Sequence, residues 1–323
     1  MKLALMLPGK RDDKWQLARQ MGVRYAITKL HPELTGMEGP YCRDTLAYFL
    51  EQFAQAGLTL YGLESDEFDM QRIKLGQPGR DEDLEKYLRM IRNCGELGVK
   101  MICYNFMPTG WTRTRVDIPE RGGALTSGFD YAAARNEPRK TDREYSAEEM
   151  WENYRYFAQA VIPEARKAGV QMALHPDDPP VSPLHGVARI FISAQAVREA
   201  LDLAPGTCHG VAFCQATFKA MGENIEELVM EFGREKKIFF VHFRDIQGTA
   251  EHFQETFHDN GPTDMAKMLR LYQDVGFDGP LRPDHTPTMA GENNDQPGYA
   301  MLGRLFAVGY IKGLMHALGT AVE

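Results

Sequence analysis

Residues 238–243 read Ile-Phe-Phe-Val-His-Phe, and residues 279–284 read Gly-Pro-Leu-Arg-Pro-Asp. Each stretch is short and largely apolar, and its last or next-to-last residue is of a type that binds transition metals. Val170–His175 and Gly210–Cys214 are two earlier stretches of the same kind. Such nearly continuous apolar runs are typical of parallel strands that are covered on both faces. We therefore predict four parallel strands in the second half of the chain, each ending near a polar side chain.

The first half of the chain contains four more runs of this type, separated by amphipathic segments. These predicted strands are Lys2–Leu7, Arg24–Thr28, Thr59–Leu63 and Lys100–Asn105. The predicted helices between strands include Asp44–Ala56, Asp81–Leu97, Ala147–Lys167 and Met265–Val275. Eight strand and helix units with right-handed crossovers predict an α/β fold, a closed (β/α)₈ TIM barrel. We expect a single domain over residues 1–323, because no linker or compositional break divides the chain.

Cap residues support several of the predicted helix boundaries. Ser146–Glu149 has the pattern of a capping box at the start of the helix after strand four. Gly98 and Gly169 follow the helices before strands four and five, where a left-handed C-cap suits glycine.

The segment 108–145, after strand four, is too long for an ordinary connection between a strand and a helix. Loops that follow the strands of a barrel lie on the face where barrel enzymes place their active sites. We therefore predict that this insertion is a lid over the site.

Composition narrows the class of partner. The chain of 323 residues has a formal net charge of −8, with 43% hydrophobic and 25% charged residues. This acidic balance disfavours nucleic acid or an anionic membrane as a partner, and no apolar stretch reaches the roughly 20 residues of a membrane span. The five cysteines are odd in number and show no framework spacing, which indicates a reducing compartment. We expect a cytoplasmic protein that acts on a small molecule.

Four residues at the ends of the last four strands are candidate metal ligands, namely His175, Cys214, His242 and Asp284. Strand ends converge at the mouth of a barrel, so these side chains should meet there. A single histidine or cysteine at such a position is more often a core residue than a ligand, but four in register favour a metal. Cys208 is the rival for Cys214, although it precedes its strand and should lie at the opposite end of the barrel.

The donor types restrict the choice of metal. Two imidazoles, a thiolate and a carboxylate suit Mn²⁺, Fe²⁺ or Zn²⁺ rather than Mg²⁺ or Ca²⁺. Because substrate must also bind, the coordination number has to exceed four, which favours Mn²⁺ or Fe²⁺ over a closed tetrahedral zinc site.

Several motifs resemble those of the D-mannonate dehydratase family, in the same order along the chain. The matching stretches are Cys103–Pro108 with Trp111–Thr114, His175–Pro180, Val241–Arg244, Phe253–His258 with Gly261 and Asp264-Met265, and Arg282–His285. The resemblance covers residues 100–300 approximately.

The resemblance implies a xylose-isomerase-like barrel with Mn²⁺ (or Fe²⁺) at the four positions named above. It implies that D-mannonate loses water to give 2-keto-3-deoxy-D-gluconate, with His285 and Tyr299 transferring protons in an order left open. By analogy with the family, it also implies a homo-oligomer. By their residue types alone, His285 could instead orient Asp284, and Tyr299 could be a surface aromatic.

Other polar side chains are candidates for substrate binding. Arg113 and Arg244 could hold a carboxylate, since a guanidinium matches its shape, or they could form structural ion pairs. Asn105 could bond a hydroxyl, and His258 could contact the substrate, the lid or solvent. Asp177 and Asp178 could be turn residues beside prolines.

Two positions depart from the family pattern. Gly110 stands where the family carries an acidic residue, and Thr286 stands where it carries glycine. Both changes bear on the identity of the substrate.

Other functions remain open at this stage. Related sugar isomerases and epimerases use paired glutamates at their metal, whereas Glu64 is the only glutamate at a predicted strand end. A sugar-acid binding protein without activity is a second alternative. A metal-dependent nuclease would need more carboxylates and a basic groove.

Overall fold

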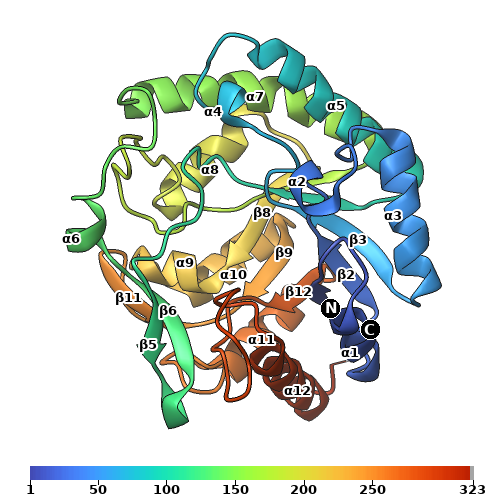
Figure 1. Ribbon diagram of the computed structural model, residues 1–323, viewed down its shortest axis with the longest axis vertical. Coiled ribbons are helices and arrows are strands. Elements are labelled where there is room, and N and C mark those ends of the chain that lie inside the picture. Colours follow the sequence, from blue (N-terminus) through green and yellow to red (C-terminus); the bar gives the residue numbers. More distant parts are fainter. Residues whose placement is uncertain (321–323) are drawn as a thin grey trace.

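A computed structural model describes residues 1–320 and shows a closed barrel of eight parallel strands (Figure 1). Around the ring the order is β1-β2-β3-β4-β7-β8-β9-β12, which is also their order along the chain. Their bounds are β1 Lys2–Met6, β2 Tyr25–Thr28, β3 Thr59–Glu64, β4 Met101–Tyr104, β7 Gln171–Leu174, β8 His209–Cys214, β9 Ile238–Phe243 and β12 Pro280–Pro283. All eight predicted strands form, so the predicted fold class is confirmed.

Helices surround the barrel and bury its outer face. Their bounds are α1 Asp13–Gln20, α2 Pro32–Thr35, α3 Arg43–Gln55, α4 Gln71–Lys74, α5 Arg80–Leu97, α6 Tyr131–Ala134, α7 Ala147–Ala168, α8 Ala194–Leu203, α9 Gln215–Ala220, α10 Ile225–Arg234, α11 Met265–Asp274 and α12 Met301–Ala317. The main apolar core lies between strands and helices, where side chains such as Trp15, Phe53, Phe157 and Phe213 are buried. A smaller cluster, including Ile27, Met101 and Phe240, fills the barrel interior.

The predicted caps are present. Ser146 accepts a hydrogen bond from the amide of Glu149, whose carboxylate accepts one from the amide of Ser146, and this box begins α7. Gly98 and Gly169 end α5 and α7 with φ values of 85° and 70°. A left-handed backbone of this kind is readily adopted by glycine, so the two helices end where the sequence predicts.

The long segment after β4 contains regular secondary structure rather than being one open loop. It forms the hairpin of β5 (Arg115–Pro119) and β6 (Leu125–Asp130), with a short turn of 3₁₀-helix at Arg121–Gly123, followed by α6. β6 pairs with β11 (His252–Glu255), which pairs with β10 (Ile246–Thr249), giving an antiparallel sheet beside the barrel mouth (Figure 1). The segment is therefore anchored to the connection after β9, and its movement as a lid stays a prediction.

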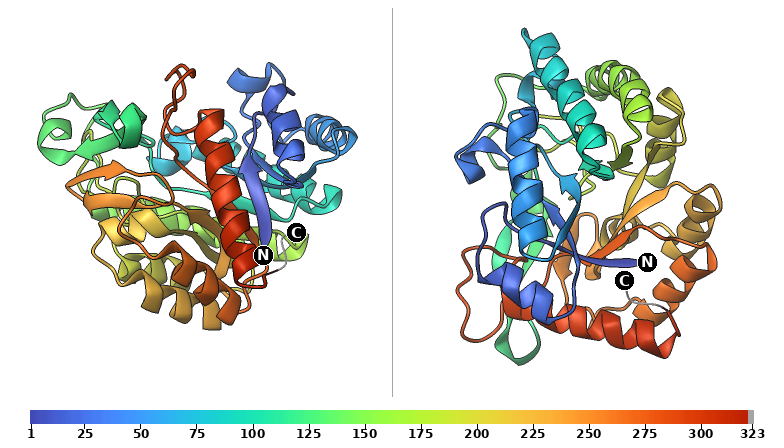
Figure 2. Two further views of the ribbon diagram at one scale, coloured as in Figure 1. Left: turned by 90° about the horizontal axis from the view of Figure 1, so that it is seen from below. Right: turned by 90° about the vertical axis from the view of Figure 1, so that its right-hand side faces the viewer.

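The last helix closes the structure against the first strand. Figure 2 shows α12 running beside β1, and Arg304 of α12 donates to the carbonyl of Met6 at the end of that strand (2.5 Å). Among residues 1–320, no helix has the length and apolar character needed to cross a membrane.

The capping box of α7 makes a measurable contribution to stability. Ser146→Ala removes the acceptor for the Glu149 amide and is expected to lower the free energy of unfolding by about 1 kcal/mol. Ser146→Asp restores an acceptor and should keep most of that stability. Urea unfolding followed by circular dichroism measures both variants, and an equal loss in the two would contradict the capping role.

Candidate active site

The ends of β7, β8, β9 and β12 bring the four predicted metal ligands together. The donor atoms of His175, Cys214 and His242 all lie within 4.8 Å of one another. His175 Nε2 is 3.1 Å from His242 Nδ1, and that nitrogen is 3.6 Å from Asp284 Oδ2. Each residue belongs to a different strand or its end, so the closure of the barrel produces the cluster.

Neighbouring groups orient both histidines. Nδ1–H of His175 donates to the carbonyl of Pro176 at 2.6 Å, which leaves Nε2 with a free lone pair toward His242. The second nitrogen of His242, Nε2, lies 3.2 Å from Glu64 Oε1 at the end of β3. Partners of this type fix which imidazole nitrogen faces a metal and strengthen it as a ligand.

Cys214 is placed to be a thiolate. Its sulfur accepts hydrogen bonds from Arg244 Nε at 3.3 Å and from the Thr217 hydroxyl at 3.1 Å. Burial opposes ionisation, but the charge of Arg244 and bonds from His175 and His242 hold the pKa of Cys214 well below its ordinary value. Cys208 lies just before β8, and its thiol faces the carbonyl of Ile162. All five cysteines are free.

The charges buried at the barrel mouth fit a divalent cation. Four carboxylates and one thiolate lie against three guanidinium groups, so two negative charges are left uncompensated. The anions are Glu64, Asp178, Glu255, Asp284 and Cys214, and the cations are Arg113, Arg244 and Arg282. Burial and Arg282 oppose protonation of His242, yet Glu64 and Asp284 raise its pKa well above the ordinary value. The same negative charges that favour a proton on His242 would also stabilise a metal ion at this position.

Arg113 and Arg244 are held in a network of buried carboxylates. Arg113 binds both oxygens of Asp178, at 2.7 and 3.0 Å, and also binds Glu255 at 2.6 Å. Arg244 binds Asp178, Glu255 at 2.6 Å and Asp284 at 2.8 Å. Neither arginine lines the cavity at the site. Of the two roles that the sequence left open for them, the structure shows the structural ion pair for both.

Asp178 is therefore more than a turn residue. It is buried, and burial is outweighed by Arg113 and Arg244, which lower its pKa. Asp177 also does more than form a local turn, since its carboxylate accepts from the amides of Ile190 and Phe191, both at 2.9 Å, which lie 13 and 14 residues later in the chain.

A cavity of about 300 Å³ opens beside the candidate metal ligands. Of the predicted site residues, those that line it are Asn105, His175, His242, Asp284, His285 and Tyr299. Arg113, Arg244, Cys214 and His258 lie behind this lining. The other polar or aromatic residues of the lining include Lys29, Glu64, Ser65, Trp111, Asp178 and Arg282.

Asn105 presents its amide NH₂ group to the cavity. Its Oδ1 atom accepts from Lys74 Nζ at 2.9 Å and from the Met107 amide at 3.0 Å. Lys74 is buried and is also paired with Asp66. Because both donors occupy the oxygen, the amide nitrogen is the group left to bond a substrate hydroxyl.

His285 and Tyr299 lie side by side at the cavity wall, with ring centroids 5.3 Å apart. Nδ1 of His285 is 2.9 Å from Glu255 Oε1 and 2.8 Å from Arg244, while the Tyr299 hydroxyl is 3.4 Å from Asp284 Oδ1. Burial, followed by the charge of Asp284, raises the pKa of Tyr299. Tyr299 is thus not a surface aromatic, and its phenol keeps its proton at neutral pH.

His258 is buried rather than exposed to solvent. It packs near the ring of Phe243, with centroids 6.4 Å apart, and burial lowers its pKa to about 4. It lies outside the cavity lining, so direct contact with substrate stays a prediction.

The sequence did not single out several cavity residues. Lys29 and Ser65 directly follow β2 and β3. Their position at the end of a strand, which identified the metal ligands, could have identified them as well. Trp111 reaches the cavity from the long segment and contacts His285, with ring centroids 5.0 Å apart. Arg282 lies within β12 and bridges Glu64 and Asp284, both at 2.6 Å.

The two departures from the family pattern lie outside the cavity lining. Gly110 has φ 71°, and its carbonyl accepts from Arg189 at 2.7 Å. Thr286 is buried, and its amide bonds the carbonyl of Gly298 at 3.0 Å, next to Tyr299. Neither residue is placed to select the substrate by direct contact.

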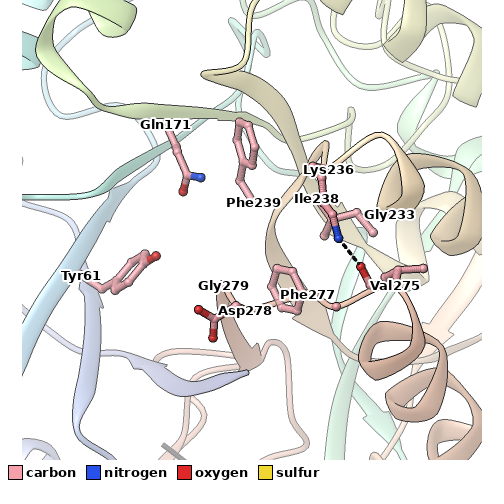
Figure 3. Close-up of a pocket in the computed structure, with 11 residues that line it drawn as sticks. Tyr61, Gln171, Gly233, Lys236, Ile238, Phe239, Val275, Phe277, Asp278 and Gly279 are labelled. Carbon is pink, nitrogen blue, oxygen red and sulfur yellow. Dashed lines mark hydrogen bonds between the residues drawn. The ribbon is translucent and has the colours of Figure 1, made fainter.

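A second hollow lies at the opposite end of the barrel. Figure 3 shows Tyr61, Gln171 and Asp278 around it, with Phe239 at the start of β9 and Lys236, which donates to the carbonyl of Val275 at 2.7 Å. Its walls come from the beginnings of strands, away from the metal ligands and from the face where barrel enzymes act.

Comparisons with known proteins give a consistent result. The family model for D-mannonate dehydratase matches residues 1–144 and 137–323. Mannonate dehydratase 2 of Halalkalibacterium halodurans is 31% identical over 99% of this chain and 100% of its own length. The mannonate dehydratase of Streptococcus pneumoniae is 30% identical over 98% and 94% of the two chains.

Solved structures show the same likeness in three dimensions. The crystal structure of mannonate dehydratase from Streptococcus suis serotype 2 has a TM-score of 0.89 and 29% identity, covering 100% of this chain and 97% of the other. A xylose isomerase domain protein from Planctomyces limnophilus has a TM-score of 0.62 at 14% identity, covering 98% and 97% of the two chains, which shows a shared fold.

Glu255 compensates buried positive charge, so its removal should be costly. Glu255→Gln leaves Arg113 and Arg244 short of a counter-charge, and we expect it to lower the free energy of unfolding at pH 7 by about 3–5 kcal/mol. Burial opposes ionisation, but Arg244, His285 and Arg113 lower the pKa of Glu255 from 4.5 to about 2. The advantage of the wild type should therefore be complete above pH 4.5 and shrink as the pH falls toward 2.

Urea unfolding at pH 7 and at about pH 3 tests this dependence. The exposed Glu251→Gln serves as the matched control and should change stability little at either pH. A Glu255→Gln deficit that is the same at both pH values would contradict the assigned ionisation of Glu255.

Proposed function

The chain belongs to the D-mannonate dehydratase family, and from this premise we propose that it removes water from D-mannonate to give 2-keto-3-deoxy-D-gluconate. The chain is a carbon–oxygen hydro-lyase on a xylose-isomerase-like TIM barrel. The observation that carries the proposal is one cavity wall on which His175, His242 and Asp284 stand next to His285 and Tyr299. A metal-binding set and two proton-transfer groups are what this elimination requires.

The reaction breaks two bonds to neighbouring carbons. A base takes the proton from C2, beside the carboxylate, and an acid protonates the hydroxyl leaving from C3 as water. The resulting enol becomes the 2-keto acid when C3 gains a proton. His285 and Tyr299 are the groups for these transfers, and their order stays open.

Mn²⁺ (or Fe²⁺) is the metal we propose for His175, Cys214, His242 and Asp284. When bound, such an ion stabilises negative charge that develops on substrate oxygens. The protein's own part is to hold the ligands in place: Pro176 and Glu64 orient the histidines, while Arg244 and Arg282 hold Asp284.

The epimerase alternative is disfavoured by the surroundings of Glu64. An epimerase base must be free to take a proton, but Glu64 binds Arg282 through both oxygens, at 2.6 and 3.1 Å. Burial resists ionisation, yet Arg282 and His242 lower the pKa of Glu64 to about 2. A carboxylate held this way is a weak base.

The reaction itself is tested with purified protein, Mn²⁺ and D-mannonate. We expect a 2-keto-3-deoxy acid, detected by the periodate–thiobarbiturate reaction, and roughly a 10²- to 10⁴-fold lower rate in Tyr299→Phe. A stereoisomer of mannonate as the product would support the epimerase instead. No turnover at full metal occupancy would support a binding protein.

The choice of cysteine is tested by metal analysis. Cys214→Ser should lose bound Mn²⁺ after dialysis, because a thiolate ligand is replaced by a hydroxyl that stays protonated. Cys208→Ser is the matched control and should retain metal, since its thiol faces the carbonyl of Ile162. Full metal content in Cys214→Ser would show that this cysteine is not a ligand.

A further inference from the structure

Lys29 stands across the cavity from the candidate metal ligands. It directly follows β2, and its half-buried side chain lines the cavity. In the closed ring, β2 is the strand opposite β8, which carries Cys214. Lys29 therefore faces a ligand bound in the cavity from the side that supplies no metal ligand.

Lys29 differs from the other cations near the cavity in its contacts with the protein. Within the described residues 1–320, its side chain makes no hydrogen bond or ion pair. Arg113, Arg244 and Arg282, in contrast, are bound to the buried carboxylates. The ammonium group of Lys29 is therefore available to pair with an anionic group of a bound ligand.

Glu67, an acidic side chain whose pKa Lys29 influences, does not serve as its counter-charge. Glu67 accepts a hydrogen bond from the Leu30 amide at 2.6 Å, and its side chain is buried. Burial raises the pKa of Glu67 to about 8, despite that bond and the charge of Lys29. At neutral pH the group is thus mainly protonated and offers Lys29 no full negative charge.

The balance of charges gives the type of ligand. The four carboxylates and the thiolate of the site are neutralised by the three arginines together with one divalent cation. Lys29 then adds one positive charge, and no ion pair within residues 1–320 balances it. A sugar acid with a single carboxylate restores neutrality, whereas a neutral sugar does not.

We propose that Lys29 binds the carboxylate of the sugar-acid substrate, the task the sequence led us to expect of Arg113 and Arg244. The assignment rests on the proposed function for the presence of such a substrate. Ser65 and Asn105, which directly follow β3 and β4, also line the cavity and are available for hydroxyl groups. Lys29 thereby selects an acid over a polyol, and it favours the enolate charge that forms next to the carboxylate.

The test compares two probes that differ in the carboxylate. Binding of D-gluconate and of D-mannitol to Mn²⁺-loaded protein is measured by calorimetry. Lys29→Met should weaken D-gluconate binding roughly 10- to 100-fold, the effect of one charged hydrogen bond. D-Mannitol binding should change less than about threefold, because it has no charged group to lose.

Control variants separate binding from folding. Lys29→Arg keeps a cation and should recover most of the D-gluconate affinity. Lys100→Met removes an exposed lysine at the opposite end of the barrel, before β4, and should change neither probe. Metal content and melting temperature should be the same in Lys29→Met and wild type.

Several outcomes would overturn the assignment. These are equal weakening of both probes, unchanged D-gluconate binding in Lys29→Met, and wild-type protein that does not prefer D-gluconate to D-mannitol. Because binding is measured without turnover, the result is independent of the dehydration assay. Wild type that binds D-gluconate through Lys29 but does not convert D-mannonate would contradict the proposed function alone.

Discussion

The buried guanidinium of Arg244 is the interaction on which the site depends. It contacts Cys214, Asp178, Glu255 and Asp284, and it lies 2.8 Å from Nδ1 of His285. Two candidate metal ligands and a candidate proton-transfer residue are thus held by one planar group. A guanidinium suits this place because it stays charged when buried and directs its donors in fixed directions.

The antiparallel sheet of β5, β6, β10 and β11 holds two further charged groups of this network in place. Glu255 ends β11, and the Thr126 hydroxyl of β6 donates to its carbonyl at 3.1 Å. Arg113, just before β5, binds the same carboxylate and Asp178. The segment 108–145 therefore contributes the positive charge of Arg113, without which Glu255 and Asp178 would be less well compensated. A lid that moved as one piece would have to break these buried ion pairs, which is expensive.

Much of the fold was predictable from local patterns. Eight apolar runs, helical segments between them and caps at Ser146, Gly98 and Gly169 locate the barrel elements to within a few residues. The sequence also predicted that His175, Cys214, His242 and Asp284 lie close together, because the ends of parallel strands converge at the mouth of a barrel. The hairpin β5–β6 was missed because neither strand is a continuous apolar run, and because its pairing partner lies more than 100 residues later in the chain. Sheet pairing over such a separation leaves no periodic signal.

The sequence alone thus determined the barrel and the convergence of the metal-ligand set, because both follow from the period of the strands and the direction in which they run. Only the tertiary structure decided which charged side chains form ion pairs within the protein. Arg113 and Arg244 look like carboxylate binders in the sequence, yet Asp178 and Glu255 occupy them. Lys29 belongs to no motif, and its side chain forms no ion pair among residues 1–320. The physical reason is that an ion pair depends on distance and burial, and two residues far apart in the chain acquire both only when the barrel closes.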